Sequence, residues 1–148
     1  MKETTKSKIT VEECTSKKEW DAFITSFKEA NFLQSWDFYE FYQSINHQIV
    51  RRTFRRDGKI VATYAGEVEP AKRGRHLAIA GGPILDWQDQ NLVKRVFDDM
   101  KNVAKNLQCV FVRVRPQLEY NQESAQIFKE HNFRKAPMYL SVEYAGVL

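Results

Sequence analysis

Two arginines in one short segment have the residue type and spacing that suit anion binding. Arg113 and Arg115 alternate with valines in Cys109-Val110-Phe111-Val112-Arg113-Val114-Arg115, so both fall on the same face of an expected strand. A guanidinium is costly to bury without a partner, and its planar fork matches phosphate or carboxylate oxygens. We therefore predict that Arg113 and Arg115 contact a bound anion. The alternative is pairing with acids of the protein itself, namely Glu67, Glu69 or Glu143.

Aromatic side chains gather in the helix expected over residues 35–46. Phe38 and Tyr42 belong to the apolar stripe that is expected to face the core. Trp36 and Tyr39 fall at the margin of that stripe, where a flat ring with a polar edge can stack on a sugar or a base. We predict Trp36 and Tyr39 as substrate-binding residues, with plain core packing as the alternative.

A glycine pair, Gly81-Gly82, precedes Pro83 where a strand is expected to end. Glycine permits a tight bend and lets a ligand come close to the backbone. We therefore predict Gly81 and Gly82 as substrate contacts. The simpler reading is a bend that only turns the chain toward the next helix.

The sequence identifies no catalytic base, so the catalytic residues stay unassigned. Glu67 and Glu69 share one face of an expected strand and could orient an amine, although structural pairing is the favoured reading. The three histidines and two cysteines show no spacing typical of a metal site. We expect no bound metal.

Basic residues slightly outnumber acidic ones, 23 against 19, for a formal net charge of +4. This excess mildly favours anionic partners. Two basic groups could meet the phosphates of RNA: Arg51, Arg52, Arg55 and Arg56, and Lys72, Arg73 and Arg75. Strand alternation splits the first group between two faces, so most of it is expected to be solvated or to protect a sheet edge.

The apolar periodicity of the 148 residues predicts a disordered tail at 1–7 and a single α/β (α+β) domain at 8–148, with a mixed, mostly antiparallel sheet flanked by helices. Asp57-Gly58 predicts a tight hairpin, and Asn132 a left-handed helix end. Strands are expected at 8–13, 48–56, 59–69, 76–80, 109–115 and 138–144, and helices begin at Ser16, Ser35, Asp89 and Asn121. No apolar run approaches the roughly 20 residues that span a bilayer, and no signal peptide is visible, so a cytoplasmic location is expected.

The expected order, β-α-α-β-β-β-α-β-α-β, is that of the GNAT-type acyltransferase fold. Five segments, in order along the chain, further resemble the Fem family of peptidoglycan interpeptide-bridge aminoacyltransferases: Phe32-Leu33-Gln34-Ser35-Trp36-Asp37-Phe38, Gly58-Lys59-Ile60-Val61-Ala62, Ala80-Gly81-Gly82-Pro83-Ile84-Leu85-Asp86, Val112-Arg113-Val114-Arg115-Pro116 and Asn132-Phe133-Arg134-Lys135-Ala136-Pro137-Met138.

The resemblance implies transfer of an amino acid from aminoacyl-tRNA, the donor, to the peptide of a nucleotide- or lipid-linked cell-wall precursor, with no cofactor. It also implies two GNAT-like domains, of which this chain is similar to the first, on the acceptor side. The missing half would come from a second GNAT-like domain or from a homodimer. Two alternatives stay open: a stand-alone GNAT-type N-acyltransferase with a thioester donor, and a non-catalytic GNAT-like binding module.

Overall fold

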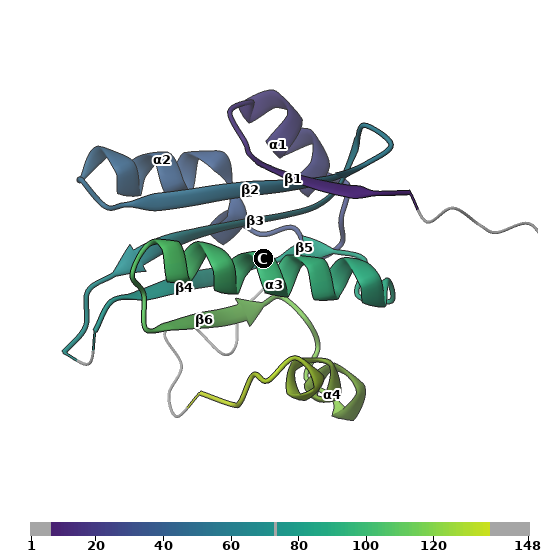
Figure 1. Cartoon of the computed structure of the whole chain (residues 1–148). Helices are drawn as coiled ribbons and strands as arrows, with labels where there is room; N and C mark the ends of the chain where they lie inside the picture. The colour runs from purple at the N-terminus through teal and green to yellow at the C-terminus, as the bar shows by residue number, and fades with distance from the viewer. Residues whose placement is uncertain (1–6, 73, 137–148) are drawn as a thin grey trace, which may run out of the picture. The chain divides into compact units, whose positions relative to one another are not determined.

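A computed structural model describes residues 7–72 and 74–136 of the chain (Figure 1). Its elements follow one another in the order β1 (Ile9–Glu13), α1 (Lys17–Thr25), the 3-10 turn η1 (Phe32–Gln34), α2 (Trp36–Ser44), β2 (Ile49–Arg56), β3 (Lys59–Glu69), β4 (His76–Gly81), β5 (Ile84–Leu85), α3 (Gln90–Asn106), β6 (Phe111–Pro116) and α4 (Gln122–Glu130). The last expected strand, at 138–144, lies outside the described residues.

The chain divides into two compact units, residues 1–117 and 118–148. Of the described elements, the first unit holds the strands β1 to β6 with α1, η1, α2 and α3, and the second holds α4. We expected a tail at 1–7 and one domain over 8–148, and those boundaries stay a prediction.

The sheet is mixed and mostly antiparallel, as predicted. The described strands run in the order β1-β2-β3-β4-β6, and among them only the β4–β6 pair is parallel. The short strand β5, which we did not predict, pairs with β3 through Ala62 and Thr63. The chain after Gly82 therefore returns to the sheet before α3 begins, whereas we expected a direct turn into the helix. Two residues of strand are too short to give a periodic signal.

Local sequence signals explain most element ends. Asp57 and Gly58 both have positive φ, 52° and 77°, which matches the two-residue turn between β2 and β3. The Ser16, Ser35 and Asp89 side chains each accept a hydrogen bond from the backbone of the following helix, as N-caps do.

The second unit confirms two further expectations. Asn121 caps α4 in a capping box with Ser124, and Asn132 has the predicted left-handed backbone, with φ of 63°. The side chains of Phe128 and Phe133 pack edge to face, with ring centroids 5.8 Å apart.

Register assigns the helices to opposite faces of the sheet. Arg52 pairs with Tyr64 across β2 and β3, and both side chains hydrogen-bond Asp99 of α3. Their neighbours Arg51 and Ala65 also pair, and both lie against α2 on the other face, because successive side chains in a strand alternate between faces. The α3 face packs the largest apolar layer, which includes Phe54, Leu77, Ile79, Leu92, Val96, Phe97 and Met100.

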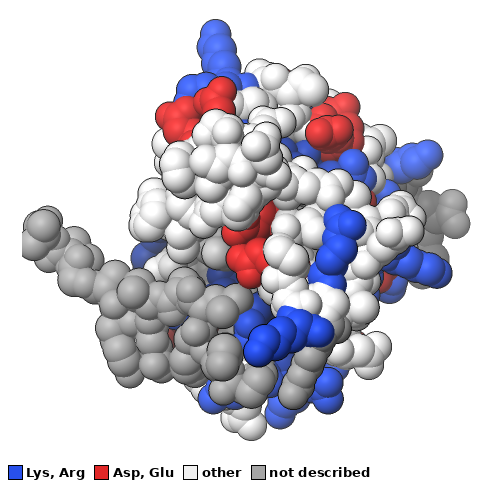
Figure 2. Space-filling model, turned by 90° about the vertical axis from the view of Figure 1, so that its left-hand side faces the viewer, with Lys and Arg blue, Asp and Glu red and all other residues white. Residues whose placement is uncertain are grey.

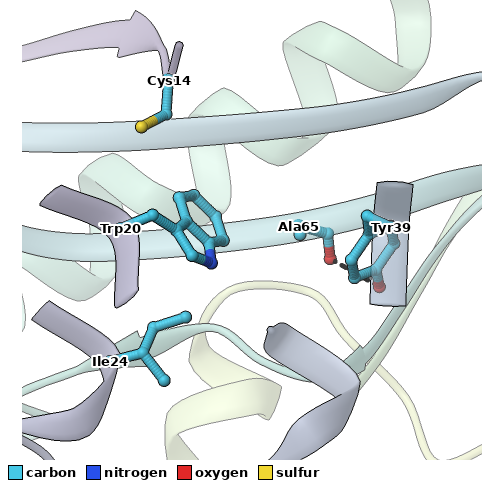
Figure 3. Close-up of a cluster of buried hydrophobic side chains, with 5 residues drawn as sticks. All are labelled: Cys14, Trp20, Ile24, Tyr39 and Ala65. Carbon is cyan, nitrogen blue, oxygen red and sulfur yellow. Dashed lines mark hydrogen bonds between the residues drawn. The ribbon is translucent and has the colours of Figure 1, made fainter. Parts of the chain in front are cut away.

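The face under α1 and α2 has its own buried cluster (Figure 3). It comprises Cys14, Trp20, Ile24, Tyr39 and Ala65, with Phe23, Trp36, Phe38 and Ile49 packed around it. The cluster packs both helices against β3.

The buried carboxylate of Asp99 yields a stability prediction. Asp99 accepts two hydrogen bonds from Arg52, at 3.0 and 2.8 Å, and one from Tyr64 at 2.8 Å. Asp99→Ala leaves a half-buried guanidinium without its carboxylate, and we expect it to lower the unfolding free energy by about 3–5 kcal/mol. The matched control is Asp98→Ala, which removes an exposed pair with Lys94 and should cost less than about 1 kcal/mol. Urea denaturation of both variants makes the comparison, and equal losses would contradict the assignment.

Candidate functional site

The glycine pair at the end of β4 packs against the protein's own side chains. Gly81 has φ of 76°, and a Cβ atom there would lie 2.2 Å from Asn31 Oδ1. A Cβ on Gly82 would lie 2.6 Å from the amide carbon of Gln34. Both glycines are buried. The groups that come close to the backbone here are the protein's own Asn31 and Gln34 side chains, and contact of Gly81 and Gly82 with a substrate stays a prediction.

Gln34 explains why these glycines are needed. Its side chain is fully buried, donates to the carbonyls of Ala65 (3.1 Å) and Ala80 (2.7 Å), and accepts from the Ala65 N–H (2.8 Å). The direct ladder between β3 and β4 covers only Glu67–Glu69 and His76–Ala78. One amide side chain therefore supplies hydrogen bonds at the point where the two strands separate.

Tyr39 and Trp36 differ from the expected stacking pair. Tyr39 is only 2% exposed, and its hydroxyl donates to the Ala65 carbonyl at 3.1 Å. Burial raises the pKa of Tyr39, which keeps the hydroxyl protonated as that hydrogen bond requires. Our placement of Tyr39 at the helix margin is wrong, because the helix is rotated so that Phe38 and Tyr42 are half-buried and Tyr39 enters the core.

Trp36 is half-buried and already has a cation above its ring. The Arg51 guanidinium carbon lies 3.8 Å from the ring centroid, and the same side chain donates to the Trp36 carbonyl at 3.0 Å. Arg51 thus uses the flat surface that we predicted for a sugar or a base.

The arginines of β2 all have partners inside the protein. Arg51 lies over Trp36 and Arg52 pairs with Asp99. Arg55 pairs with Glu12 and Glu19, and Arg56 with Asp89. The predicted split of this group between two faces is confirmed for Arg51 and Arg52. The expectation that most of the group is solvated or protects a sheet edge is wrong, because β2 lies between β1 and β3 and none of the four arginines is exposed.

Arg113 and Arg115 lie on one face of β6, as predicted. Arg113 pairs in register with Ala78 and Arg115 with Ala80. Ala78 in turn pairs with Glu67 of β3. Directly paired residues share a face, so the arginines stand on the same face as Glu67, with the small, half-buried alanines of β4 between them.

An array of carboxylates and imidazoles occupies the β3 side of that face, and we call these four residues the Glu–His row: His47, Glu67, Glu69 and His76. The Nδ1 of His47 lies 2.7 Å from Glu67 Oε2, and His76 Nε2 lies 3.2 Å from Glu69 Oε2. Glu69 and His76 are paired across β3 and β4. Figure 2 shows one side of the molecule, where acidic atoms form small patches among uncharged ones.

The Glu67 carboxyl has a perturbed acidity. Burial raises its pKa, a hydrogen bond from His47 opposes the rise, and the neighbouring carboxyl of Glu69 adds to it. A shift of this kind marks a functional-site candidate when it accompanies a specific charge partner. The sequence singled out both glutamates but missed His47 and His76, because only strand register brings the imidazoles to them.

Within the described residues, no group of three or more histidine, cysteine or acidic side chains could hold a metal ion. None of the helices described there is long and apolar enough to cross a bilayer. The face carries the two arginines of β6 and the carboxylates and imidazoles of the Glu–His row.

The mixed sheet with helices on both faces defines the class of protein: an α/β domain of the GNAT-type acyltransferase fold. Glucosamine-6-phosphate N-acetyltransferase from Arabidopsis thaliana superposes with a TM-score of 0.65 at 14% identity, over 93% of this chain and 99% of that one. A predicted acetyltransferase from Clostridium acetobutylicum, solved with acetyl-CoA, gives a TM-score of 0.61 at 13% identity, over 92% and 96%. At such identities the likeness shows the fold alone.

The particular family is shown by the sequence. The FemAB family model matches residues 15–146, so this chain belongs to the FemAB family. The structure of FemX superposes with a TM-score of 0.72 at 18% identity, over 83% of this chain. The chain spans only 31% of FemX. No curated protein matches the chain.

Gly81→Ala tests whether the glycine is required by internal packing. Gly81 and Gly58 have nearly equal φ, 76° and 77°, but a Cβ on Gly58 would meet nothing within 4 Å. Gly58→Ala should cost about 1–2 kcal/mol of unfolding free energy through backbone strain alone. Gly81→Ala adds overlap with Asn31 and Leu33, and we expect a total of about 2–4 kcal/mol. Equal costs in chemical denaturation would show that the space beside Gly81 is open.

Glu67→Gln tests the acidity of Glu67. Because its pKa is raised above the usual 4.5, the folded protein binds this proton more tightly than the unfolded chain does. Ionisation of Glu67 then costs folding free energy at pH values above the raised pKa, and nothing below 4.5. The neutral variant should gain stability relative to the native protein as the pH rises. Urea titrations from below pH 4.5 to neutral pH measure this gain, and Glu40→Gln on the exposed side of α2 is the control.

Proposed function

We propose that this chain is the acceptor-side domain of a peptidoglycan interpeptide-bridge aminoacyltransferase. In this proposal the amino acid comes from aminoacyl-tRNA and passes to the peptide of a nucleotide- or lipid-linked cell-wall precursor. The observation that carries the proposal is membership of the FemAB family over residues 15–146. The FemX superposition, which spans 31% of that chain, supports a role as one part of a larger catalytic unit.

The proposed reaction is an acyl transfer to an amine. The amine nitrogen forms a bond to the ester carbonyl carbon, the tRNA hydroxyl leaves, and the ammonium proton must first be lost. Enzymes promote such a step by holding both substrates in line and by stabilising the oxyanion. Arg113 and Arg115 are proposed to contact phosphate or carboxylate groups of the acceptor, in line with their shared face on β6.

The β4 turn supports the choice of a donor other than a thioester cofactor. A helix N-terminus that binds pyrophosphate presents several free backbone N–H groups to the ligand. Here the glycine pair precedes β5 and not a helix, Pro83 has no N–H, and Gly81 and Gly82 are buried against Asn31 and Gln34. We therefore propose no cofactor and keep aminoacyl-tRNA as the donor substrate.

A second candidate rests on a specific observation. The structures of stand-alone acetyltransferases superpose over nearly their whole length, 99% for the Arabidopsis enzyme. A free-standing N-acyltransferase with a thioester donor is therefore the competing function. The remaining reading, a GNAT-like binding module, differs from both in having no transfer activity.

The partner that completes the site is proposed to be a second GNAT-like domain or a second copy of this chain. The FemX superposition, in which this chain spans 31% of that chain, supports such a larger unit. The oxyanion contacts are assigned to the partner.

Binding measurements on the chain separate the candidate functions. We expect isothermal calorimetry to detect a nucleotide-linked muropeptide and to give no heat with acetyl-CoA. Arg113→Gln together with Arg115→Gln should weaken muropeptide binding at least tenfold, since each charge-assisted contact contributes about 1.5–3 kcal/mol. The control is Lys94→Gln, at an exposed position of α3, and this variant should bind muropeptide like the native protein. Acetyl-CoA binding without muropeptide binding would replace the proposal by the thioester alternative.

A further inference from the structure

The Glu–His row is the one part of the candidate face that the proposed function has not yet used. Glu67 and Glu69 are two residues apart on β3, so their side chains emerge on the same face of the sheet. The Glu67 side chain is 10% exposed and that of Glu69 is 35% exposed. The row thus runs from a buried carboxyl to one that reaches the surface.

His76 supplies a second, independent observation. Its residue is only 5% exposed, yet neither ring nitrogen has a hydrogen-bond partner. Nε2 approaches Glu69 Oε2 to 3.2 Å, but the contact does not have hydrogen-bond geometry. The ring is held from one side by stacking on Phe111, with centroids 4.7 Å apart and planes 6° from parallel. A buried imidazole with unused hydrogen-bonding capacity is aimed at the carboxylate row.

We propose that the Glu–His row is a binding site for a protonated primary amine. This inference rests on the proposed function, and within it the ligand is the amine of the acceptor peptide that is to be acylated. A primary ammonium has three N–H donors in a compact group. The row offers the Glu67 carboxylate, the Glu69 carboxylate and an unpartnered nitrogen of His76 as acceptors.

The surroundings select a cation and give its proton an exit. Ala78 lies beside Glu67 in the β3–β4 pair, so a methyl group borders Glu67 on that strand, and the cation of Arg113 stands one strand farther away, in register with Ala78. His47 contacts Glu67 at 2.7 Å and its side chain is 40% exposed. A proton that moves from the ammonium to the Glu67 carboxylate leaves a neutral amine and a neutral acid, and His47 can pass that proton to solvent.

The opposite view is that the two glutamates and two histidines only neutralise one another. Mutual pairing would satisfy both imidazoles, as it does for His47. It does not do so for His76, whose Nδ1 has no partner and whose Nε2 is misaligned with Glu69. It also leaves the Glu67 carboxyl with a raised pKa next to a second carboxyl, which is the environment that an added cation would relieve.

The test uses the whole chain and a short peptide with an acetylated N-terminus and one free lysine side chain, with the same peptide also acetylated on that side-chain amine as the neutral control. We expect the free amine to bind with millimolar affinity, as monitored by NMR titration. Addition of the amine should shift the ring nitrogen signals of His76 and His47, and the acetylated peptide should leave them unchanged. If the row were merely structural, the free amine would also leave the signals of His76 and His47 unchanged.

Variants separate charge from fold. Glu67→Gln with Glu69→Gln keeps the size and polarity of the row and should weaken amine binding at least tenfold. Glu40→Gln, an exposed carboxylate of α2, should bind like the native protein. Retained amine binding in the double variant, with a folded protein by circular dichroism, would overturn the inference.

The outcomes also separate this inference from the proposed function. Muropeptide binding that is insensitive to Glu67→Gln with Glu69→Gln would overturn the amine site and leave the aminoacyltransferase proposal standing. Binding of the lysine peptide at the row, together with acetyl-CoA binding and no muropeptide binding, would keep the amine site and overturn the aminoacyl-tRNA proposal. In that case the amine would be the acceptor of a thioester-dependent enzyme.

Discussion

One buried amide side chain holds together the strands on which the candidate site is built. Backbone N–H and C=O groups inside a protein must find partners, because each one left unpaired costs about 1–3 kcal/mol. Between β3 and β4 the ladder ends at Glu67 and Ala78, and beyond it Gln34 serves Ala65 and Ala80. The backbone carbonyl of Gln34 in turn accepts a hydrogen bond from the indole N–H of Trp20 at 2.8 Å. The turn η1, helix α1 and both strands are therefore coupled through this residue.

This constraint shapes the sheet face that carries the candidate site. Because Gln34 and Asn31 fill the space at the end of β4, the backbone there must lack side chains, and Gly81 and Gly82 meet that need. Because Tyr39 donates to the same Ala65 carbonyl, α2 is held with Tyr39 inward. The part of the face that stays polar then lies farther along β3 and β4, at the Glu–His row, and continues to Arg113 on β6.

The two sheet faces have different tasks. The α3 face is an apolar layer with one satisfied polar group, Asp99, held by Arg52 and Tyr64. The other face combines a small aromatic core under α1 and α2 with partly exposed charges of both signs. In the strand register, two alanines of β4 lie between Glu67 of β3 and the arginines of β6.

The sequence by itself determined the features that depend on near neighbours in the chain. Apolar periodicity, N-cap residues and the Asp57-Gly58 turn predicted nearly every described helix and strand, and five ordered segments indicated the family. It also determined that Arg113 and Arg115 share a face, because alternation in a strand is a local property.

Only the tertiary structure decided which residues meet. It turned Tyr39 into the core, placed Arg51 on Trp36, assigned Gly81 and Gly82 to Asn31 and Gln34, and added β5 to the sheet. It also brought His47 and His76 to the two glutamates. These contacts depend on helix rotation and on strand register, and a shift of one residue in register reverses the face of every side chain. No local pattern carries that information.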